Sequence, residues 1–285
     1  MDTDHIDSLL PPEMALQAEL VGVAKVNMSA IKTLVLAILA GAFIAFGAIF
    51  STTVTAGSTM SFGVTRLIGG LAFSLGLVLV IVGGAELFTG NNLIIMAWAN
   101  KKVSTLQVIR NWILVYTGNM IGAAFIVVIM LFSRQYLFGS GAVGINMLNI
   151  AKAKCELGFT QAIALGILCN ILVCLAVWLC YSARSASVKI LSIVFPISAF
   201  VAAGFEHSIA NMYFIPMGIL LRESGTPDFL NLVNKSAQNY ASVSWNNYFV
   251  NNLLPVTIGN IIGGAGLVGL VYWFVYLKKA KENQA

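Results

Sequence analysis

Long apolar stretches without charged side chains alternate with polar connections along most of the chain. Four stretches contain no Asp, Glu, Lys or Arg, namely residues 33–65, 111–133, 157–183 and 236–277. Two more, residues 67–100 and 190–221, contain one acidic residue each. Because a helix needs about 20 apolar residues to cross the hydrocarbon core, this pattern predicts six membrane spans. Their predicted centres are Ala42, Leu77, Gly122, Val173, Ala202 and Leu267.

Composition supports this interpretation. Hydrophobic residues make up 59% of the 285 positions and charged residues only 9%, whereas an average soluble domain has roughly 25% charged residues. A soluble globule could not cover its surface with so few charges, so that class is excluded. No cluster of Lys and Arg beside aromatic residues suggests a nucleic-acid partner. The predicted fold class is an all-α membrane protein with six transmembrane helices.

The distribution of basic residues predicts the orientation. With both termini in the cytoplasm, ten of the 16 Lys and Arg residues lie on the inner side, as cytoplasmic connections usually favour. The N-terminus begins with Asp2, Asp4 and Asp7 and lacks the basic region of a signal peptide. We therefore expect a cytoplasmic leader over residues 1–32, with a short amphipathic helix near 13–26, and a cytoplasmic tail over residues 278–285.

Two patterns repeat between the halves of the chain, at residues 33–132 and 157–277 of a single channel domain spanning 1–285. The pattern N-x-x-x-V-x-x-G-N-x-I-G occurs at 111–122 and again at 252–263, and G-x-E-x-x-x-x-N occurs at 84–91 and 204–211. Because each half holds three spans, the second half must enter the membrane from the opposite side. Inverted repeats of this kind commonly place a transport site at their interface.

The second and fifth spans are predicted to be broken. Each window exceeds 30 residues, and a continuous helix of that length would extend about 50 Å, beyond a core of roughly 30 Å. Gly84 lies beside Glu86, and Gly204 lies beside Glu206. Non-helical backbone in a membrane is tolerated only inside protein or along a cavity. The half-helix N-termini beyond the breaks would favour a small anion without a buried Lys or Arg.

The polar residues at the breaks are candidates for function. Intramembrane carboxylates are functional by default, but Glu86 and Glu206 could also pin their loops by accepting local hydrogen bonds. For Glu86 we favour pinning, and for Glu206 pinning and substrate tuning are equally favoured. His207 can change charge near neutral pH, so it could hold an anion or pass it a proton. Thr89 is the hydroxyl partner expected from the other half.

The remaining candidates have simpler roles. Asn170 could line a pore or bond to a neighbouring helix, while Asn119 and Asn260, each beside a glycine, are expected to join helices at close approach. Asn91 and Asn211 end the repeated pattern around the breaks. Large apolar residues near the breaks could form constrictions that slow water and ions. These residues are Phe73, Leu77, Leu87, Phe88 and Phe200.

Three stretches, residues 83–91, 166–176 and 204–212, resemble signatures of the formate/nitrite transporter family, and the sequence is most similar to its bacterial formate-channel branch. The resemblance implies an aquaporin-like protomer in the bacterial inner membrane, assembled as a homopentamer with one pore per protomer and no cofactor. It implies passage of formate or a similar small monovalent anion, either as the anion or by release as the neutral acid.

The resemblance also implies roles for individual residues. Thr89 and His207 would form the central pore pair, and Asn170 would line the pore. Lys154 would attract anions in the outer vestibule and communicate with Glu206. The cytoplasmic constriction would consist of Leu77, Leu87 and Phe88, and the periplasmic constriction of Phe73 and Phe200.

Three other functions are alternatives to a formate channel. The same signatures serve channels for nitrite, hydrosulfide or lactate. A neutral-solute channel of the aquaporin type would need two Asn-Pro-Ala turns, and none occurs. An intramembrane serine protease needs a nucleophilic serine within reach of a histidine; its Gly-x-Ser-Gly element is absent, although Ser208 adjoins His207. No enzymatic activity is therefore expected.

Overall fold

The computed structural model describes residues 8–224, 229–230 and 236–278, and this part of the chain is helical without any strand. Six helical segments within it are long and apolar enough to cross a membrane, as the sequence predicts. They are α2 (Ala30–Thr55), α3 (Phe62–Gly83), α5 (Thr105–Ser133), α7 (Phe159–Ser182), α8 (Ala186–Ala203) and the segment Asn247–Leu277.

The last span combines several types of helix. It consists of η4 (Asn247–Leu253), α11 (Leu254–Ile261), η5 (Ile262–Leu270) and η6 (Trp273–Leu277), of which the three η segments have π-type hydrogen bonding. The helical segment begins at Asn247, six residues before Leu253. The apolar part of the segment starts only at Leu253. Within this polar extension Tyr248 and Asn252 are buried, whereas Phe249 and Val250 are exposed, so one face of the first turns packs into the protein.

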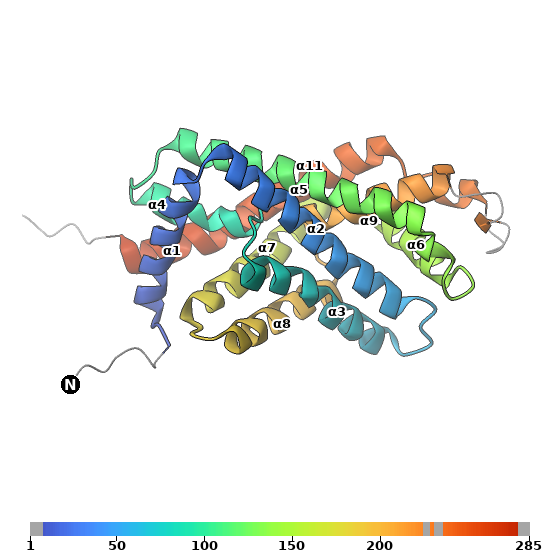
Figure 1. Cartoon of the computed structure of the whole chain (residues 1–285), viewed down its shortest axis with the longest axis horizontal. Helices are drawn as coiled ribbons and strands as arrows, with labels where there is room; N and C mark the ends of the chain where they lie inside the picture. The colour runs from blue at the N-terminus through green and yellow to red at the C-terminus, as the bar shows by residue number, and fades with distance from the viewer. Residues whose placement is uncertain (1–7, 225–228, 231–235, 279–285) are drawn as a thin grey trace, which may run out of the picture.

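Two shorter helices lie at opposite ends of the molecule (Figure 1). Helix α1 (Pro11–Asn27) packs against η1 (Gly90–Ile94) and α4 (Ile95–Ala99), while α6 (Ala142–Cys155) packs against α9 (Ser208–Ser224). Two 3-10 segments, η2 (Gln135–Leu137) and η3 (Ala237–Tyr240), complete the described elements. The sequence predicts a helix near 13–26 but not α6. Each of α1 and α6 precedes the first long helix of its half.

Two of the membrane-spanning segments are interrupted at the glycines noted in the sequence. Helix α3 ends at Gly83, and a non-helical stretch leads from Gly84 to η1. Helix α8 ends at Ala203, and Gly204 to His207 connect it to α9. Gly84 has φ 79° and Gly204 has φ 78°, a left-handed conformation that glycine adopts without a Cβ clash. Each break thus begins with a glycine because the chain must leave its helix through this conformation.

Near each interruption, glycines allow two helices to approach each other closely. A Cβ added to Gly122 of α5 would lie 1.9 Å from the Ile38 carbonyl oxygen of α2. The equivalent Gly263 would place a Cβ 2.2 Å from the Ile167 carbonyl oxygen of α7. Such close approach requires small residues at the contact. It brings the neighbouring Asn119 and Asn260 within hydrogen-bonding distance of the facing backbones.

Candidate functional site

The carboxylate at the first interruption is fully engaged by its surroundings. Glu86 Oε1 accepts a hydrogen bond from Lys25 Nζ at 2.6 Å, and Glu86 Oε2 accepts from Asn91 Nδ2 at 2.7 Å. The Asn91 amide also donates to Asn111 Oδ1 at 3.0 Å. The Glu86 backbone N–H donates to the Leu36 carbonyl of α2 at 3.2 Å. These contacts hold the loop against α1, α2 and α5.

The second interruption repeats this arrangement. Glu206 Oε1 accepts from Lys154 Nζ at 2.8 Å, and Glu206 Oε2 accepts from Asn211 Nδ2 at 2.7 Å. Asn211 also donates to Asn252 Oδ1 at 2.6 Å, and Asn252 Nδ2 reaches Glu206 Oε2 at 3.2 Å. The Glu206 backbone N–H donates to the Leu165 carbonyl at 3.2 Å. Both carboxylates therefore fix their loops, and a buried ion pair compensates each charge.

Asn119 and Asn260 join each loop to its neighbouring helix. Asn119 Nδ2 donates to the carbonyls of Ala37 and Glu86 at 2.7 and 2.9 Å, and its Oδ1 accepts from the Phe88 N–H at 3.0 Å. At the other break, the Asn260 amide makes three contacts of the same kind. Its partners are the carbonyls of Gly166 and Glu206 at 2.8 and 3.0 Å and the N–H of Ser208 at 2.9 Å. Each amide thus satisfies one carbonyl and one N–H at the break and bonds the loop to a carbonyl of the neighbouring helix, α2 or α7.

The two loops meet at a buried pair of side chains. Thr89 Oγ1 lies 3.0 Å from His207 Nε2, and both residues are at most 3% exposed. His207 Nδ1 accepts a hydrogen bond from the Ala210 N–H at 3.0 Å. Because an acceptor nitrogen carries no proton, this bond assigns the proton of a neutral ring to Nε2. The ring then donates to Thr89 Oγ1, which leaves the threonine hydroxyl proton available to another acceptor.

Asn170 supports this pair from behind. Its Nδ2 donates to the Thr89 carbonyl at 3.3 Å and to the Asn260 carbonyl at 2.7 Å, and the Cys174 thiol reaches the Thr89 carbonyl at 3.3 Å. The sequence leaves pore lining and interhelical bonding equally open for Asn170. In the structure its amide bonds to the backbone of Thr89 in the other half and of Asn260 in its own half, and Asn170 does not line the cavity described next.

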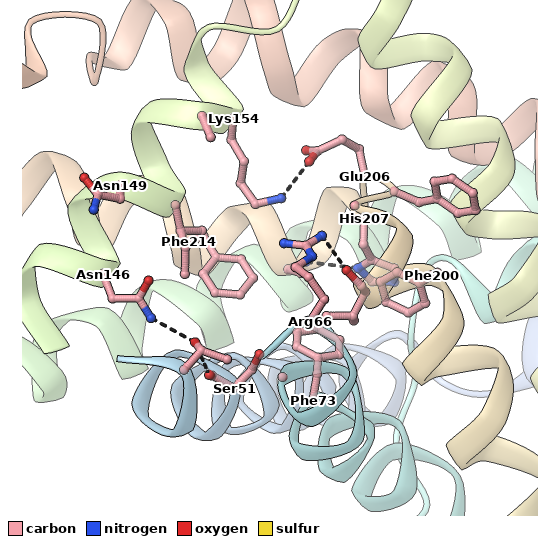
Figure 2. Close-up of a pocket in the computed structure, with 18 of the residues that line it drawn as sticks. Ser51, Arg66, Phe73, Asn146, Asn149, Lys154, Phe200, Glu206, His207 and Phe214 are labelled. Carbon is pink, nitrogen blue, oxygen red and sulfur yellow. Dashed lines mark hydrogen bonds and ion pairs between the residues drawn. The ribbon is translucent and has the colours of Figure 1, made fainter. Parts of the chain in front are cut away.

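A cavity of about 470 Å³ reaches His207 of this pair (Figure 2). Its wall contains Arg66 of α3, Lys154 of α6, Glu206 and His207. Figure 2 shows the Lys154 ammonium bonded to Glu206 and the Arg66 guanidinium turned toward the same space. Hydroxyl and amide side chains supply further polar lining. They are Ser51, Thr55, Thr65, Asn146 and Asn149.

Three aromatic rings line the cavity together with the histidine. The Phe73 and Phe200 rings pack edge to face with centroids 5.7 Å apart, and Phe200 stacks on His207 at 5.9 Å. Phe214 stacks on Phe73 at 6.3 Å, and the Lys154 ammonium lies over the Phe214 ring at 5.4 Å. Phe73, Phe200 and Phe214 therefore form a group of packed rings in the cavity wall, and the outer constriction at Phe73 and Phe200 stays a prediction.

The three residues expected at the inner constriction are also buried. Leu77, Leu87 and Phe88 are 2–3% exposed and belong to the same apolar core as Phe73 and Phe200. None of the three lines the cavity. Phe88 packs edge to face against Trp112 and Tyr116, with centroids 6.0 and 4.9 Å away. The cavity thus reaches His207 but none of these three residues, which pack in the apolar core.

The geometry does not support a serine nucleophile. Among the described residues, the buried Ser208 hydroxyl has no hydrogen-bond partner. His207 Nε2 is bonded to Thr89 and Nδ1 to the Ala210 N–H, so neither ring nitrogen is positioned as a base for Ser208. A search of the described residues finds no group of three or more His, Cys, Asp or Glu that could hold a metal.

Three residues of this site are missed by sequence reasoning. Lys25 counts only toward orientation in the sequence, yet it pairs with Glu86 as Lys154 pairs with Glu206. Its place shortly before the first span, like that of Lys154 before the fourth, is a signal that could have found it. Arg66 and Phe214 give no such signal, because their spacing is that of an ordinary helix end and an ordinary packing residue.

Comparison with known proteins agrees with this architecture. Residues 12–274 match the formate/nitrite transporter family. The formate channel FocA of Escherichia coli K12 is 47% identical over 96% of both chains, and FocB of the same organism is 38% identical over 96% of this chain and 97% of its own. A solved pentameric formate channel with formate bound has a TM-score of 0.83 and 47% identity, covering 87% of this chain and 98% of its own. A structure described as an FNT family ion channel has a TM-score of 0.78 and 26% identity, covering 92% and 98%. The chain therefore belongs to the formate/nitrite transporter family.

Proposed function

We propose that this protein is a channel for formate and similar small monovalent anions, with Thr89 and His207 as its central pore pair. The observation that carries the proposal is the 3.0 Å contact between Thr89 Oγ1 and His207 Nε2, where His207 lines a cavity whose wall also contains Arg66 and Lys154. The similarity to formate channels, and to a solved formate channel with formate bound, supports formate as the substrate.

The hydrogen-bond directions suggest how the pair holds an anion. Because Ala210 N–H occupies His207 Nδ1, the ring N–H at Nε2 donates to Thr89 Oγ1. The threonine O–H then points away from the ring and can donate to an anion oxygen. Because both side chains are buried, the hydrogen bond from His207 to Thr89 strengthens the hydrogen bond that the threonine O–H donates to the anion. No buried Lys or Arg touches this position among the described residues, so an anion is held without being trapped by an ion pair.

Proton transfer is the second mode. To release formate as the neutral acid, His207 would have to carry a proton on both nitrogens and return one of them. A proton on Nδ1 would face the Ala210 N–H, so this step requires the 3.0 Å bond to break. Anion passage needs no such rearrangement, and the pH dependence of flux separates the two modes.

The setting follows from the charge pattern and from the relatives. We propose a bacterial inner-membrane location with both termini in the cytoplasm, because the basic residues of the connections favour the side of the termini. A homopentamer with one pore per protomer is proposed from the similarity to the solved pentameric channel. Apolar side chains exposed on the outer faces of the spans, such as Phe62, Phe132 and Phe195, are free to meet lipid or a second copy.

A flux panel tests the proposal. Proteoliposomes containing the full chain are supplied with formate, nitrite, acetate, lactate or hydrosulfide at pH 5.5 and 7.5, with empty vesicles as the control. We expect saturable formate flux at both pH values, and the comparison of anions identifies the preferred substrate. His207→Ala is then compared at both pH values: loss of a pH response that the wild-type channel shows supports proton transfer. Formate flux no faster than in empty vesicles would contradict the proposed function.

A further inference from the structure

Arg66 gives the outer cavity a charge that no ion pair neutralises. Lys154 and Glu206 form an ion pair in the cavity wall at 2.8 Å, so their charges compensate each other. Within the described part of the chain, no carboxylate forms an ion pair with Arg66. With His207 neutral, the cavity wall therefore carries one net positive charge, and Arg66 supplies it.

The contacts of Arg66 fix the position of this charge. Its Nε donates to the Ala202 carbonyl at 3.0 Å, and its Nη2 donates to the Val201 carbonyl at 2.6 Å. Both carbonyls belong to the last turn of α8, directly before the break at Gly204. A cation at a helix C-terminus is favourable because the helix dipole is negative there. The guanidinium is thus held at the cavity wall by two neutral acceptors.

Donors remain free for a ligand. A guanidinium has five N–H groups and an ammonium has three. The hydrogen bonds of the Arg66 guanidinium to two α8 carbonyls and of the Lys154 ammonium to Glu206 leave several of these N–H groups unused. Figure 2 shows both cationic groups beside the space that Phe73, Phe200 and Phe214 border. The cavity therefore carries a net positive charge beside these three aromatic rings.

We propose that Arg66 is a carboxylate-binding residue of this cavity, beside Lys154, for which the family resemblance already implies anion attraction, and that Arg66 sets the concentration at which anion flux saturates. The carboxylate receives hydrogen bonds from the guanidinium and the ammonium before it passes the phenylalanine rings. Its neutralisation of the unpaired charge favours binding, while partial exposure of the site to water keeps the complex short-lived. This inference rests on the proposed function as far as flux is concerned.

The flux test uses right-side-out membrane vesicles that contain the full chain, with formate uptake measured over a range of concentrations. Arg66→Gln keeps donors for the α8 carbonyls but removes the charge, and Arg66→Lys keeps the charge. We expect Arg66→Gln to raise the half-saturating concentration roughly fivefold, as the loss of one unit charge near the ligand predicts. Arg66→Lys should stay within twofold of wild type, and so should Arg134→Gln, an exposed outer arginine that serves as the matched control.

Two results of the flux test would overturn the inference. If wild type and Arg66→Gln have the same half-saturating formate concentration, the charge of Arg66 does not bind substrate. Equal impairment of Arg66→Gln and Arg66→Lys would assign Arg66 to capping α8 alone. Absence of formate uptake by wild-type vesicles would instead overturn the proposed function.

A second measurement needs neither a variant nor transport. The purified wild-type protein is treated with phenylglyoxal, which modifies arginine, in the presence of formate or of chloride at equal ionic strength. Mass spectrometry then quantifies modification at Arg66 and Arg134. We expect formate to protect Arg66 at least threefold more than chloride does and to leave Arg134 unprotected. Equal modification of Arg66 in both salts would contradict the site even if formate flux is observed.

Discussion

The two interrupted segments share one scaffold but differ at the residues that face each other. In both, a left-handed glycine precedes a glutamate that pairs with a lysine, and an asparagine five residues later bonds to that glutamate. A second asparagine, Asn119 or Asn260, fastens the loop to the helix behind it. This duplication extends to α1 and α6, which supply the lysines, so the leader helix has a counterpart inside the chain.

The differences lie in the three residues after each glutamate. Leu87, Phe88 and Thr89 follow Glu86, whereas His207, Ser208 and Ile209 follow Glu206. The hydrogen-bonded pair combines the third position of the first loop with the first position of the second loop. A symmetric scaffold therefore holds an asymmetric centre. The repeated residues therefore maintain the fold, and the proposed chemistry lies at the positions that differ between the two loops.

The largest expected effect breaks the scaffold itself. Asn119→Ala and Asn260→Ala each remove the partner of two buried loop groups, a carbonyl and an N–H, together with a hydrogen bond to a carbonyl of α2 or α7. We expect each variant to lose about 4 kcal/mol of stability, because buried groups left without a partner cost about 1–3 kcal/mol apiece. The loss is measured as the change in the free energy of unfolding when the detergent-solubilised protein is unfolded by heat or by denaturant. If one variant unfolds like wild type and the other does not, the two loops do not share the same support.

A smaller effect is expected from closing the helix contacts. Gly122→Ala and Gly263→Ala each place a methyl group against a facing carbonyl oxygen. Overpacking of this kind costs about 2 kcal/mol, and both variants should melt at lower temperatures than wild type by similar amounts. Gly266→Ala is the matched control, since its Cβ meets nothing within 4 Å. A control as unstable as the two variants would show that helix propensity or another effect dominates.

The smallest stability effect comes from the two ion pairs. Lys25→Met and Lys154→Met each leave a buried carboxylate without its cation, and the lysine side chains are 23% and 15% exposed. Partial solvent access reduces the penalty of a buried unpaired charge, so we expect a loss of about 1–2 kcal/mol for each. Adding Glu86→Gln or Glu206→Gln should restore most of the lost stability. Failure of these second changes to restore it would show that the lysines stabilise by packing rather than by charge.

Much of this organisation could be predicted from the sequence, because its signals are local. Six spans follow from charge-free windows, and the breaks follow from glycines beside Glu86 and Glu206. The repeated Asn patterns are detectable because asparagine is rare in membrane helices. For Glu86 the sequence favours pinning of the loop over a role in transport. In the structure its carboxylate is bonded to Lys25 and Asn91.

The rest depends on contacts that sequence spacing does not encode. Lys25 lies 61 positions from Glu86, and Arg66 lies 135 positions from the Val201 carbonyl to which it donates. The role of Asn170 depends on which way its amide points across the interface between the halves. Helix α6 is missed because its 14 residues are neither long enough nor apolar enough to stand out in the pattern. These features are set by three-dimensional packing.

The most direct test gives each loop the residue of its counterpart. In proteoliposomes, initial formate flux is measured for Thr89→Ile and His207→Leu, with Leu87→Met and Ile209→Val as controls at the equivalent positions. Since a hydrogen bond to a charged group contributes about 1.5–3 kcal/mol, loss of the pair should lower flux roughly tenfold or more. The controls should transport within twofold of wild type, and all four variants should elute as folded protein. Wild-type flux in Thr89→Ile and His207→Leu would contradict the claim that the unequal positions carry transport.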